Sequence, residues 1–289
     1  MADDLSGLVE TPQAERLATG FVNTEGPLWD SNGRFLYFVD NRRSLLYRLT
    51  PGEHPVAVRD DTGEGNGLTF DLEGHVVMCE GARRRVTRIH DDGRVEVVAD
   101  RFDGKRLNRP NDVACGSDGS IYFTDPAGGR VPPAEREIPF SGIYRVSHGG
   151  DVTLVAECES PNGLAFSADE RVLYVANSRQ VAYIHALEVD ADGTLIRRRI
   201  FADMSSDDAS KAPDGVRVDV EGRVYCAGAG GIWVFTRDGA RLGIIPTPEA
   251  PANLTFGGDD LRTLFVTARS SVYAFRTAVP GIAHPCFRR

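Results

Sequence analysis

One arrangement of polar and apolar positions recurs along the chain. Each copy has Asn, Asp or Glu at or near its start, usually followed by a small residue. It continues with alternating apolar positions, a turn rich in Asp and Gly, and a second apolar run. Alternation of this kind indicates β-strands, and the turn between two such runs indicates a hairpin. Six copies are present, at residues 25–40, 65–80, 109–125, 160–177, 212–228 and 250–268.

The length of the repeat predicts the architecture. The polar residues that open the copies are 41, 45, 51, 52 and 39 residues apart, and two further strands follow each copy, as at 84–91 and 93–100. Four antiparallel strands in about 45 residues make one propeller blade. We therefore predict an all-β fold, a six-bladed β-propeller in a single domain over residues 1–289. WD40 propellers share this period, but Trp29-Asp30 occurs once and at a turn, which favours a different propeller family.

The two ends of the chain are predicted to close the ring. Residues 14–22 have the pattern of a strand with no partner before it, and we expect them to complete the last blade beside residues 271–276. An open ring would leave two long sheet edges exposed, which proteins avoid. Helical periodicity is restricted to short stretches at 134–137 and 205–211, where single turns are expected.

Composition narrows the class of protein. Gly (31) and Pro (16) together reach about 16% of the 289 residues, as expected for many turns. The net charge of −9 disfavours nucleic acid and anionic membranes as partners. Five scattered cysteines without a C-x-x-C pair, no secretory leader and no long apolar run predict a cytoplasmic protein with buried thiols. These features do not define an oligomeric state.

The six aligned polar positions indicate a site. The first strand of each blade lines the central channel of a propeller, so equivalent positions form a ring near one mouth. The ring residues are Glu25, Asn66, Asn111, Asn162, Asp214 and Asn253. Two carboxylates and four amides suit a hard cation such as Ca²⁺, Mg²⁺ or Mn²⁺. The alternative is that Asn-Gly, Asn-Asp and Asp-Gly occur here because turns favour them. Asn66 and Asn253 lack a preceding proline and are interpreted as lining or supporting residues.

Several segments together resemble the signatures of one protein family. EGPLWD, NRPNDV with IYFTDP, SPNGLAFS and APDGVRVD are similar to the SMP-30/gluconolactonase/LRE family over about residues 16–277. The resemblance implies a six-bladed propeller with one divalent metal ion in the channel. It implies Glu25, Asn162 and Asp214 as metal ligands, Asn111 as a fourth ligand or a substrate contact, and Arg109 as a contact to substrate hydroxyls or a carboxylate. Ca²⁺ is the expected ion, and Zn²⁺, Mg²⁺ or Mn²⁺ suit the same ligands.

The chain departs from the family pattern in two places. Many bacterial relatives carry a Cys-Glu-His-Gly run in the second blade, whereas this chain has Cys79-Glu80-Gly81-Ala82 and so lacks the imidazole. The segment 126–142 is long and rich in proline. The resemblance places this segment near the channel mouth as a lid, and a plain solvent loop is the alternative.

The resemblance implies a metal-dependent lactonase that acts on a sugar lactone. The metal ion would polarise the carbonyl as a Lewis acid, and a carboxylate would activate water as the general base. Asp214 is the expected base, with Glu25 as the alternative. The expected substrate contacts are Arg109, Asn111, Asp125 and Asn66. Asp125 has a second interpretation, as the cap of a turn before Pro126.

Other functions share the same scaffold. The site would also serve organophosphate hydrolysis or a lyase reaction on a carbonyl compound, and a non-catalytic propeller that binds a protein has the same repeat. The Glu25, Asn162 and Asp214 set favours an enzyme, because a binding propeller does not need carboxylates inside its channel. The chain lacks a G-x-S-x-G elbow, an H-E-x-x-H zinc motif and a phosphate-binding loop. These absences disfavour a serine hydrolase, a histidine-ligated zinc site and a nucleotide-binding protein.

Overall fold

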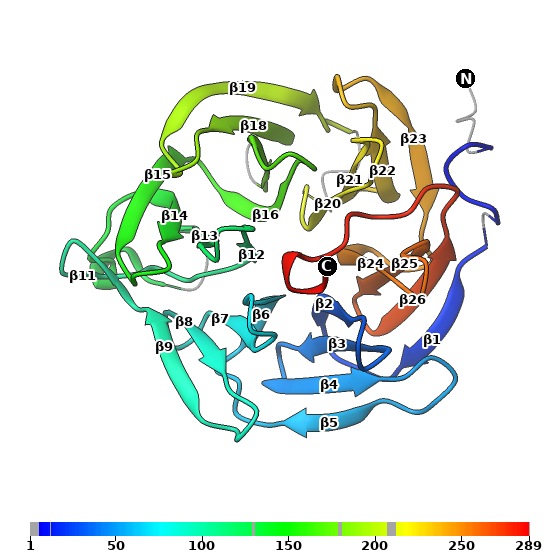
Figure 1. Cartoon of the computed structure of the whole chain (residues 1–289), viewed down its shortest axis with the longest axis horizontal. Helices are drawn as coiled ribbons and strands as arrows, with labels where there is room; N and C mark the ends of the chain where they lie inside the picture. Colours follow the sequence, from blue (N-terminus) through cyan, green and yellow to red (C-terminus); the bar gives the residue numbers. More distant parts are fainter. Residues whose placement is uncertain (1–5, 12, 129–130, 179–180, 207–211, 289) are drawn as a thin grey trace.

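Six four-stranded sheets surround a central channel in the computed structural model, which describes residues 6–11, 13–128, 131–178, 181–206 and 212–288 (Figure 1). Every sheet is antiparallel, and its strands follow one another from the channel outward. The predicted six-bladed β-propeller is confirmed. The expected turn at 205–211 lies largely outside the described residues.

The first three blades follow the first three copies of the repeat. Blade 1 contains β2 (Thr24–Asp30), β3 (Phe35–Asp40), β4 (Leu45–Leu49) and β5 (Val56–Arg59). Blade 2 contains β6 (Gly65–Phe70), β7 (Val76–Glu80), β8 (Arg85–Ile89) and β9 (Val95–Ala99). A small hairpin then joins β10 (Arg101–Phe102) to β11 (Lys105–Arg106). Blade 3 contains β12 (Val113–Cys115), β13 (Ile121–Asp125), β14 (Ser141–Val146) and β15 (Val152–Cys158), with the short 3-10 helix η1 (Pro133–Glu135) between β13 and β14.

The last three blades repeat the arrangement. Blade 4 contains β16 (Pro161–Phe166), β17 (Val172–Asn177), β18 (Tyr183–Val189) and β19 (Leu195–Asp203). Blade 5 contains β20 (Val216–Val218), β21 (Val224–Gly228), β22 (Gly231–Phe235) and β23 (Arg241–Pro246). Blade 6 contains β24 (Pro251–Gly257), β25 (Thr263–Ala268) and β26 (Ser271–Arg276), and its outer strand is β1 (Glu15–Thr19).

The N-terminal strand closes the ring as predicted. β1 pairs antiparallel with β26, with Glu15 opposite Ala274 and Thr19 opposite Ser271. The Thr24 hydroxyl donates to the Ser271 carbonyl at 3.0 Å, which joins the first blade to the last. The ring is therefore held by strand pairing between residues from the two ends of the chain.

Recurring Asp and Gly residues build the turns between strands. In the turn after β6, Asp71 accepts a hydrogen bond from the His75 amide at 2.8 Å, and Gly74 has a φ of +89°. In the turn after β20, Asp219 accepts from the Arg223 amide at 2.9 Å, and Gly222 has a φ of +82°. A positive φ is readily adopted by glycine, so the Asp-x-x-Gly spacing serves the hairpin.

The hydrophobic core lies between the blades. Buried apolar side chains form six clusters, and each cluster joins two neighbouring blades. Trp29 of blade 1 stacks on Phe265 of blade 6 with ring centroids 5.1 Å apart. Tyr225 of blade 5 meets Phe256 of blade 6 edge to face at 5.2 Å. This packing positions the inner strands, which carry the ring residues.

The state of the cysteines agrees in part with the prediction of buried thiols. All five cysteines are free thiols, and four of them are buried, as predicted. Among the described residues, no helix has the length and apolar character needed to cross a lipid bilayer.

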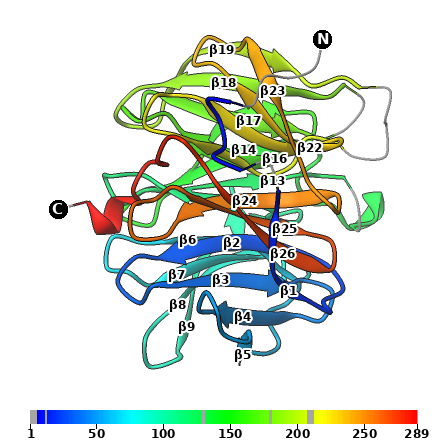
Figure 2. The ribbon, with the colours of Figure 1, turned by 90° about the vertical axis from the view of Figure 1, so that its right-hand side faces the viewer.

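The C-terminal segment closes one end of the channel, a feature that the repeat did not predict. After β26 the chain crosses back to the centre of the ring and ends in the 3-10 helix η2 (Pro285–Phe287) (Figure 1). The Ile282 amide donates to the Val218 carbonyl at 3.4 Å, and Phe287 packs on Phe70 with ring centroids 5.4 Å apart. Figure 2 shows η1 and η2 on opposite sides of the ring. We call these sides the η1 face and the C-terminal face.

His284 anchors this segment in its neutral form. Its Nε2 lies 3.0 Å from the Thr69 hydroxyl oxygen, and Phe70 packs against its ring. Burial, together with the positive charges of Arg288 and Arg217, lowers the pKa of His284 to about 3 against the opposing effect of Asp71. The unfolded chain therefore binds a proton at His284 near pH 6.5 that the folded protein excludes.

We expect acid to weaken the fold through His284. Because the unfolded state binds the extra proton between about pH 6.5 and 3, the free energy of unfolding falls as the pH decreases through this window. Denaturant melts at pH 7.5 and pH 5 should show a loss in the wild type that exceeds the loss in His284→Gln by up to about 2 kcal/mol. His54→Gln, at an exposed position, is the control and should behave like the wild type. Equal pH dependence in wild type and His284→Gln would contradict the assignment.

Candidate functional site

The ring residues lie where the inner strands begin. Glu25, Asn66, Asn162 and Asn253 belong to β2, β6, β16 and β24, and Asn111 and Asp214 each stand two residues before their strands. Their six positions are therefore equivalent in the six blades. Glu25 and Asn253 are buried, with 7% and 3% of their surface exposed, and the other four are half-buried.

Glycine brings neighbouring members of the ring into contact. A Cβ atom on Gly26 would overlap the Asn66 carbonyl group, and one on Gly67 would lie 2.9 Å from the Asn111 carbonyl oxygen. The Gly67 amide donates to that oxygen at 2.8 Å. In the first three blades, the backbone beside one ring residue therefore contacts the backbone of the ring residue in the next blade.

The other half of the ring is built in the same way. A Cβ atom on Gly163 would lie 2.5 Å from the Cα of Gly215 and 2.8 Å from the Val216 nitrogen. One on Gly215 would lie 2.7 Å from the Cα of Asn253. Such distances essentially never occur for real Cβ atoms. The Asn-Gly and Asp-Gly pairs therefore reflect close packing between blades, which is a stronger constraint than the turn preference considered from the sequence.

Thr124 connects the two halves. Its carbonyl accepts the Asn111 amide at 2.9 Å, and its hydroxyl donates to the Asn162 carbonyl at 2.7 Å. The series of contacts therefore runs from blade 1 to blade 6, and β2 packs against β24 to complete the circle. The structure brings the predicted ring together.

A pocket opens over part of this ring. It has a volume of about 330 Å³ and contains four of the predicted site residues, Asn66, Arg109, Asn111 and Asn162. Its remaining lining residues are Asn41, Pro126, Gly128, Ser160, Pro161 and Ser178. The wall is thus mainly amide, hydroxyl and guanidinium, which suits a small polar ligand rich in hydroxyl groups.

A buried carboxylate spans the channel below the ring. Asp112 is 1% exposed, and its Oδ2 lies 3.5 Å from the Asn253 side-chain amide of the opposite blade. Burial raises the pKa of Asp112, while the positive charge of Arg217 lowers it and the negative charge of Asp214 raises it. Burial lowers the pKa of Arg217, and Asp112 opposes this effect. Neither group is among the residues predicted from the sequence, although Asp112 stands within the PND segment and Arg217 two residues after PDG.

Asp125 lies behind the pocket wall. It is fully buried, and its two carboxylate oxygens accept the backbone amides of Asn108 at 2.7 Å and Arg109 at 2.5 Å. Burial raises the pKa of Asp125 to about 7, and these amide bonds oppose the rise. Both oxygens face the backbone that leads into Asn111, which is the arrangement of a positioning residue, and the substrate contact stays a prediction.

Residues equivalent to Asp125 in other blades make the same kind of hydrogen bond to the backbone. Asp40 ends β3 as Asp125 ends β13, and it accepts the amides of Val22 at 2.9 Å and Asn23 at 3.1 Å. Asn177 ends β17 and accepts the Ser160 amide at 2.9 Å. In blades 1, 3 and 4, the last residue of the second strand therefore holds the segment that leads into a ring residue. Aligning the ends of the repeats, as well as their beginnings, would have indicated it.

The described part of the segment 126–142 packs on the blades and contributes two residues to the pocket wall. Ile138 and Val131 are buried, the Asn108 side chain donates to the Phe140 carbonyl at 3.0 Å, and Arg84 donates to the Glu135 carbonyl at 3.2 Å. Pro126 and Gly128 reach the pocket. The described part of the segment is thus anchored to the blades, and residues 129–130 lie outside the description. Whether it also closes as a lid stays a prediction.

Arg109 has an ion-pair partner that the sequence pattern does not predict. Its guanidinium pairs with the Glu64 carboxylate, and both side chains are half-buried. Gly81 lies against the same guanidinium, because a Cβ atom there would be 3.1 Å from the Arg109 Cζ. Gly81 is the position at which the family pattern leads us to expect histidine, so the arginine lies in space that a side chain would otherwise occupy.

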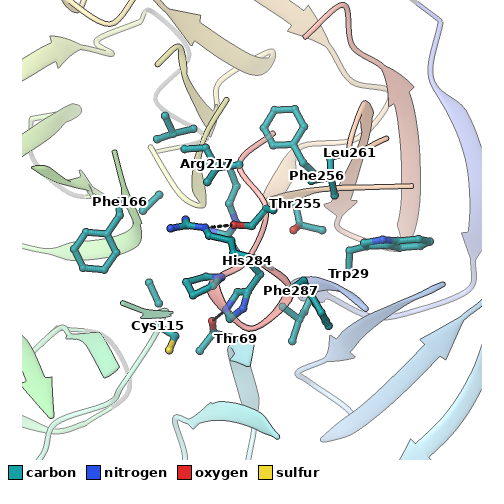
Figure 3. Close-up of a pocket in the computed structure, with 18 of the residues that line it drawn as sticks. Trp29, Thr69, Cys115, Phe166, Arg217, Thr255, Phe256, Leu261, His284 and Phe287 are labelled. Atoms are coloured by element: carbon teal, nitrogen blue, oxygen red, sulfur yellow. Dashed lines mark hydrogen bonds between the residues drawn. The ribbon is translucent and has the colours of Figure 1, made fainter. Parts of the chain in front are cut away.

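A second pocket lies on the C-terminal side of the channel. It encloses about 130 Å³ between the inner strands and the C-terminal segment, and His284 and Phe287 point into it (Figure 3). Its wall is largely apolar, and Arg217 is one of its charged members. The predicted ring residues do not line this pocket. We therefore assign the site to the η1 face, where the polar groups converge.

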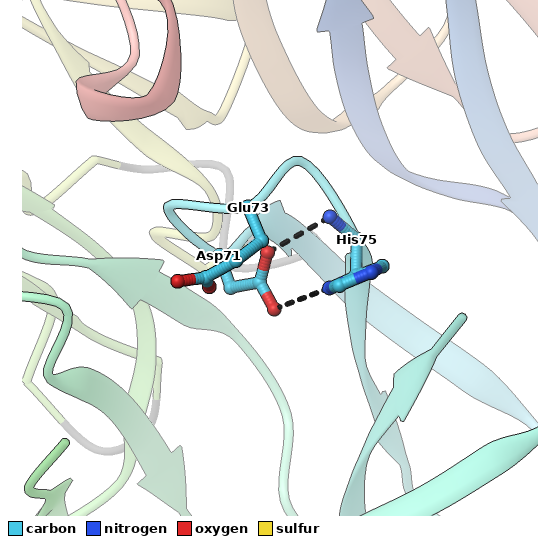
Figure 4. A group of neighbouring side chains, drawn as sticks. All are labelled: Asp71, Glu73 and His75. Carbon is cyan, nitrogen blue, oxygen red and sulfur yellow. Dashed lines mark hydrogen bonds and ion pairs between the residues drawn. The ribbon is translucent and has the colours of Figure 1, made fainter. Parts of the chain in front are cut away.

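One cluster of His, Asp and Glu lies away from the channel. Among the described residues, Asp71, Glu73 and His75 place their ligand atoms within 4.8 Å of one another (Figure 4). Asp71 already accepts from His75 Nδ1 at 3.0 Å and from Arg88 Nε at 2.7 Å. Since the Arg88 cation already neutralises this carboxylate, the cluster is explained as a turn with an ion pair.

Known proteins share both the sequence pattern and the fold of this chain. A family model described as "SMP-30/Gluconolactonase/LRE-like region" matches residues 23–270. A gluconolactonase of Zymomonas mobilis is 32% identical over 300 residues, covering 94% of this chain and 83% of the relative. A pentonolactonase of Haloferax volcanii is 29% identical, covering 84% of this chain and 80% of the relative. The structure of a gluconolactonase from Xanthomonas campestris superposes with a TM-score of 0.85 and 33% identity, covering 94% of this chain and 92% of that one.

Substitution of Gly163 tests the close packing of the ring. Gly163→Ala should lower the free energy of unfolding by about 1–3 kcal/mol, because the added methyl group overlaps the backbone at Asp214 and Gly215. Gly149→Ala is the matched control, since the nearest atom to its Cβ would be 3.6 Å away, and its effect should stay below about 1 kcal/mol. Urea denaturation measures both. Equal effects of the two substitutions would refute the packing argument.

Proposed function

Because the chain belongs to the SMP-30/gluconolactonase/LRE-like family, we propose that it hydrolyses the ring ester of a sugar lactone at the η1 face. The observation that carries this proposal is a pocket of about 330 Å³ lined by the ring amides Asn66, Asn111 and Asn162. The ring carboxylates Glu25 and Asp214 do not line the pocket but neighbour Asn66 and Asn162 along the ring. The gluconolactonase and pentonolactonase relatives support the same substrate class. A sugar lactone offers a carbonyl for attack and several hydroxyls for the amide and guanidinium groups of the wall.

We propose that Glu25, Asn162 and Asp214 hold one divalent cation, with Asn111 as the fourth contact. The donors are all oxygen atoms, as hard cations require, and glycine packing places these residues in one ring. The charges also agree. The three carboxylates of Glu25, Asp112 and Asp214 against the one cation of Arg217 leave a charge of −2 in and below the ring. We propose Ca²⁺ as the resident ion, and Zn²⁺, Mg²⁺ and Mn²⁺ suit the same donors. Such an ion acts as a Lewis acid toward a carbonyl oxygen when bound.

Asp214 is our proposed general base. Asp214 is half-buried, whereas only 7% of the surface of Glu25 is exposed. The Gly26 amide also donates a hydrogen bond to Oε2 of Glu25 at 3.3 Å. A base must reach a water molecule beside the substrate, and the more accessible carboxylate meets that need. Asp214 would take a proton from a water molecule while the oxygen of that water attacks the lactone carbonyl carbon. The bond between the carbonyl carbon and the ring oxygen then breaks, and Asp214 returns the proton to that oxygen, which becomes a hydroxyl group.

The pocket wall supplies orientation. Arg109 and Asn111 line the pocket from the same short segment, and Asn66 lies on the neighbouring blade. We propose that these side chains bind the sugar hydroxyls and hold the carbonyl over the ring. Asp125 contributes through the backbone, because its two hydrogen bonds set the direction of the segment from Asn108 to Asn111.

The proposal predicts lactone turnover that depends on Asp214. A pH-indicator assay with D-glucono-1,5-lactone and a set of five-carbon and six-carbon aldonolactones, supplied with Ca²⁺, Mg²⁺, Mn²⁺ or Zn²⁺, should show hydrolysis above the spontaneous rate. Asp214→Asn should lower kcat by at least about 10²-fold while circular dichroism stays unchanged, because the amide is not a base. Asp30→Asn, at a turn away from the ring, is the control and should keep its activity.

Two results would overturn the proposal. The first is that the wild-type protein, supplied with each cation in turn, hydrolyses no lactone faster than the spontaneous rate. The second is full activity in Asp214→Asn, which would remove Asp214 as the base. An aryl ester and a phosphotriester belong in the same assay, since turnover of either without lactone turnover would assign a different hydrolase to this site.

A further inference from the structure

We propose that Glu64 determines the charge specificity of the pocket by holding and neutralising Arg109, so that uncharged sugar lactones are preferred over lactones that carry a carboxylate. This inference rests on the proposed function. The observations behind it are the Glu64–Arg109 ion pair, the confined position of Glu64 and the glycine beneath the guanidinium.

Arg109 is held at both ends. Its amide donates to Asp125 at 2.5 Å, and its side chain runs along the pocket to pair with Glu64. The exposed fractions of the two side chains are 21% for Arg109 and 28% for Glu64. A pair that is mostly shielded from water interacts more strongly than one on the open surface. The guanidinium is therefore a constrained group of the pocket.

Glu64 itself is placed by the backbone. Its φ is +53°, a left-handed conformation that is uncommon for a residue with a side chain. The Ser44 hydroxyl oxygen of blade 1 accepts the Glu64 amide at 3.0 Å, and the Glu64 carbonyl accepts the Gly81 amide at 3.4 Å. Because these bonds already restrict the residue, forming the ion pair costs less conformational entropy than for a freely rotating surface glutamate.

Gly81 leaves room for the guanidinium. A Cβ atom at this position would lie 3.1 Å from the Cζ of Arg109, 3.2 Å from its Nη2 and 3.3 Å from its Cγ. Arg109 therefore lies across the glycine, and a larger residue here would displace the arginine from Glu64. The absence of a side chain at Gly81 and the carboxylate of Glu64 together define one position for the Arg109 guanidinium.

Neutralisation by Glu64 decides which substrates the arginine can serve. A guanidinium has five N–H donors, so hydroxyl groups of a lactone can bind to the donors that Glu64 does not use. A substrate carboxylate would instead compete with Glu64 for the same cation and would approach the carboxylates of Glu25 and Asp214. The net charge of −9 adds repulsion at longer range. The pocket should therefore discriminate against acidic lactones.

The test compares one neutral and one acidic lactone in matched variants. The specificity ratio is kcat/KM for D-glucaro-1,4-lactone, which carries a free carboxylate, divided by kcat/KM for D-galactono-1,4-lactone. Glu64→Gln should raise this ratio about tenfold or more, mainly through KM for the acidic lactone. Glu64→Asp retains the charge and should stay near the wild-type ratio. Glu53→Gln removes one charge at an exposed position and should leave the ratio unchanged.

The outcomes separate this inference from the proposed function. A ratio that does not rise in folded Glu64→Gln overturns the role of Glu64, while lactone hydrolysis by the wild type leaves the proposed function intact. If the wild type hydrolyses no lactone, the proposed function fails. Isothermal titration calorimetry with the same two lactones then decides the inference. A tenfold relative gain in affinity of Glu64→Gln for the acidic lactone supports it, and no relative gain overturns it.

Discussion

The close approach of the inner strands is the constraint on which the rest of the structure depends. Gly26, Gly67, Gly163 and Gly215 each lie against the backbone of the next blade at distances that admit no Cβ atom. The backbones can therefore pack together around the channel, and the residue before each glycine takes its place in the ring. One requirement of packing thus produces both the closed fold and the convergence of polar side chains.

Charge distribution follows from this convergence. Carboxylates that are brought together in a shielded channel raise each other's pKa unless a cation compensates them. Arg217 supplies one positive charge below the ring, and its effect on Asp112 opposes that of burial. The remaining negative charge lies at the open η1 face, whereas the C-terminal segment closes the other end with neutral His284 and aromatic side chains. The channel therefore has one polar, accessible end and one apolar, closed end.

The sequence revealed features that repeat and missed features that occur once. The six-fold pattern predicts the blades, the closing strand at Glu15–Thr19 and the ring positions, because each is required in every blade or by closure. The C-terminal segment has no repeat to reveal it, and its contact between Thr69 and His284 joins residues 215 positions apart. Glu64 pairs with Arg109 across 45 positions for the same reason. For Asp125 the signal was present, since Asp40 and Asn177 occupy the equivalent strand ends.

The most direct measurement is anomalous X-ray diffraction from crystals equilibrated with Mn²⁺, which scatters anomalously and prefers the same oxygen ligands. A single strong peak is expected within about 2.5 Å of carboxylate or amide oxygens of Glu25, Asn162 and Asp214. Glu25→Gln crystals treated in the same way should lose much of that peak. A saturated crystal with no peak in the ring, or with a peak only beside Asp71, Glu73 and His75, would contradict a cation-binding site at the η1 face.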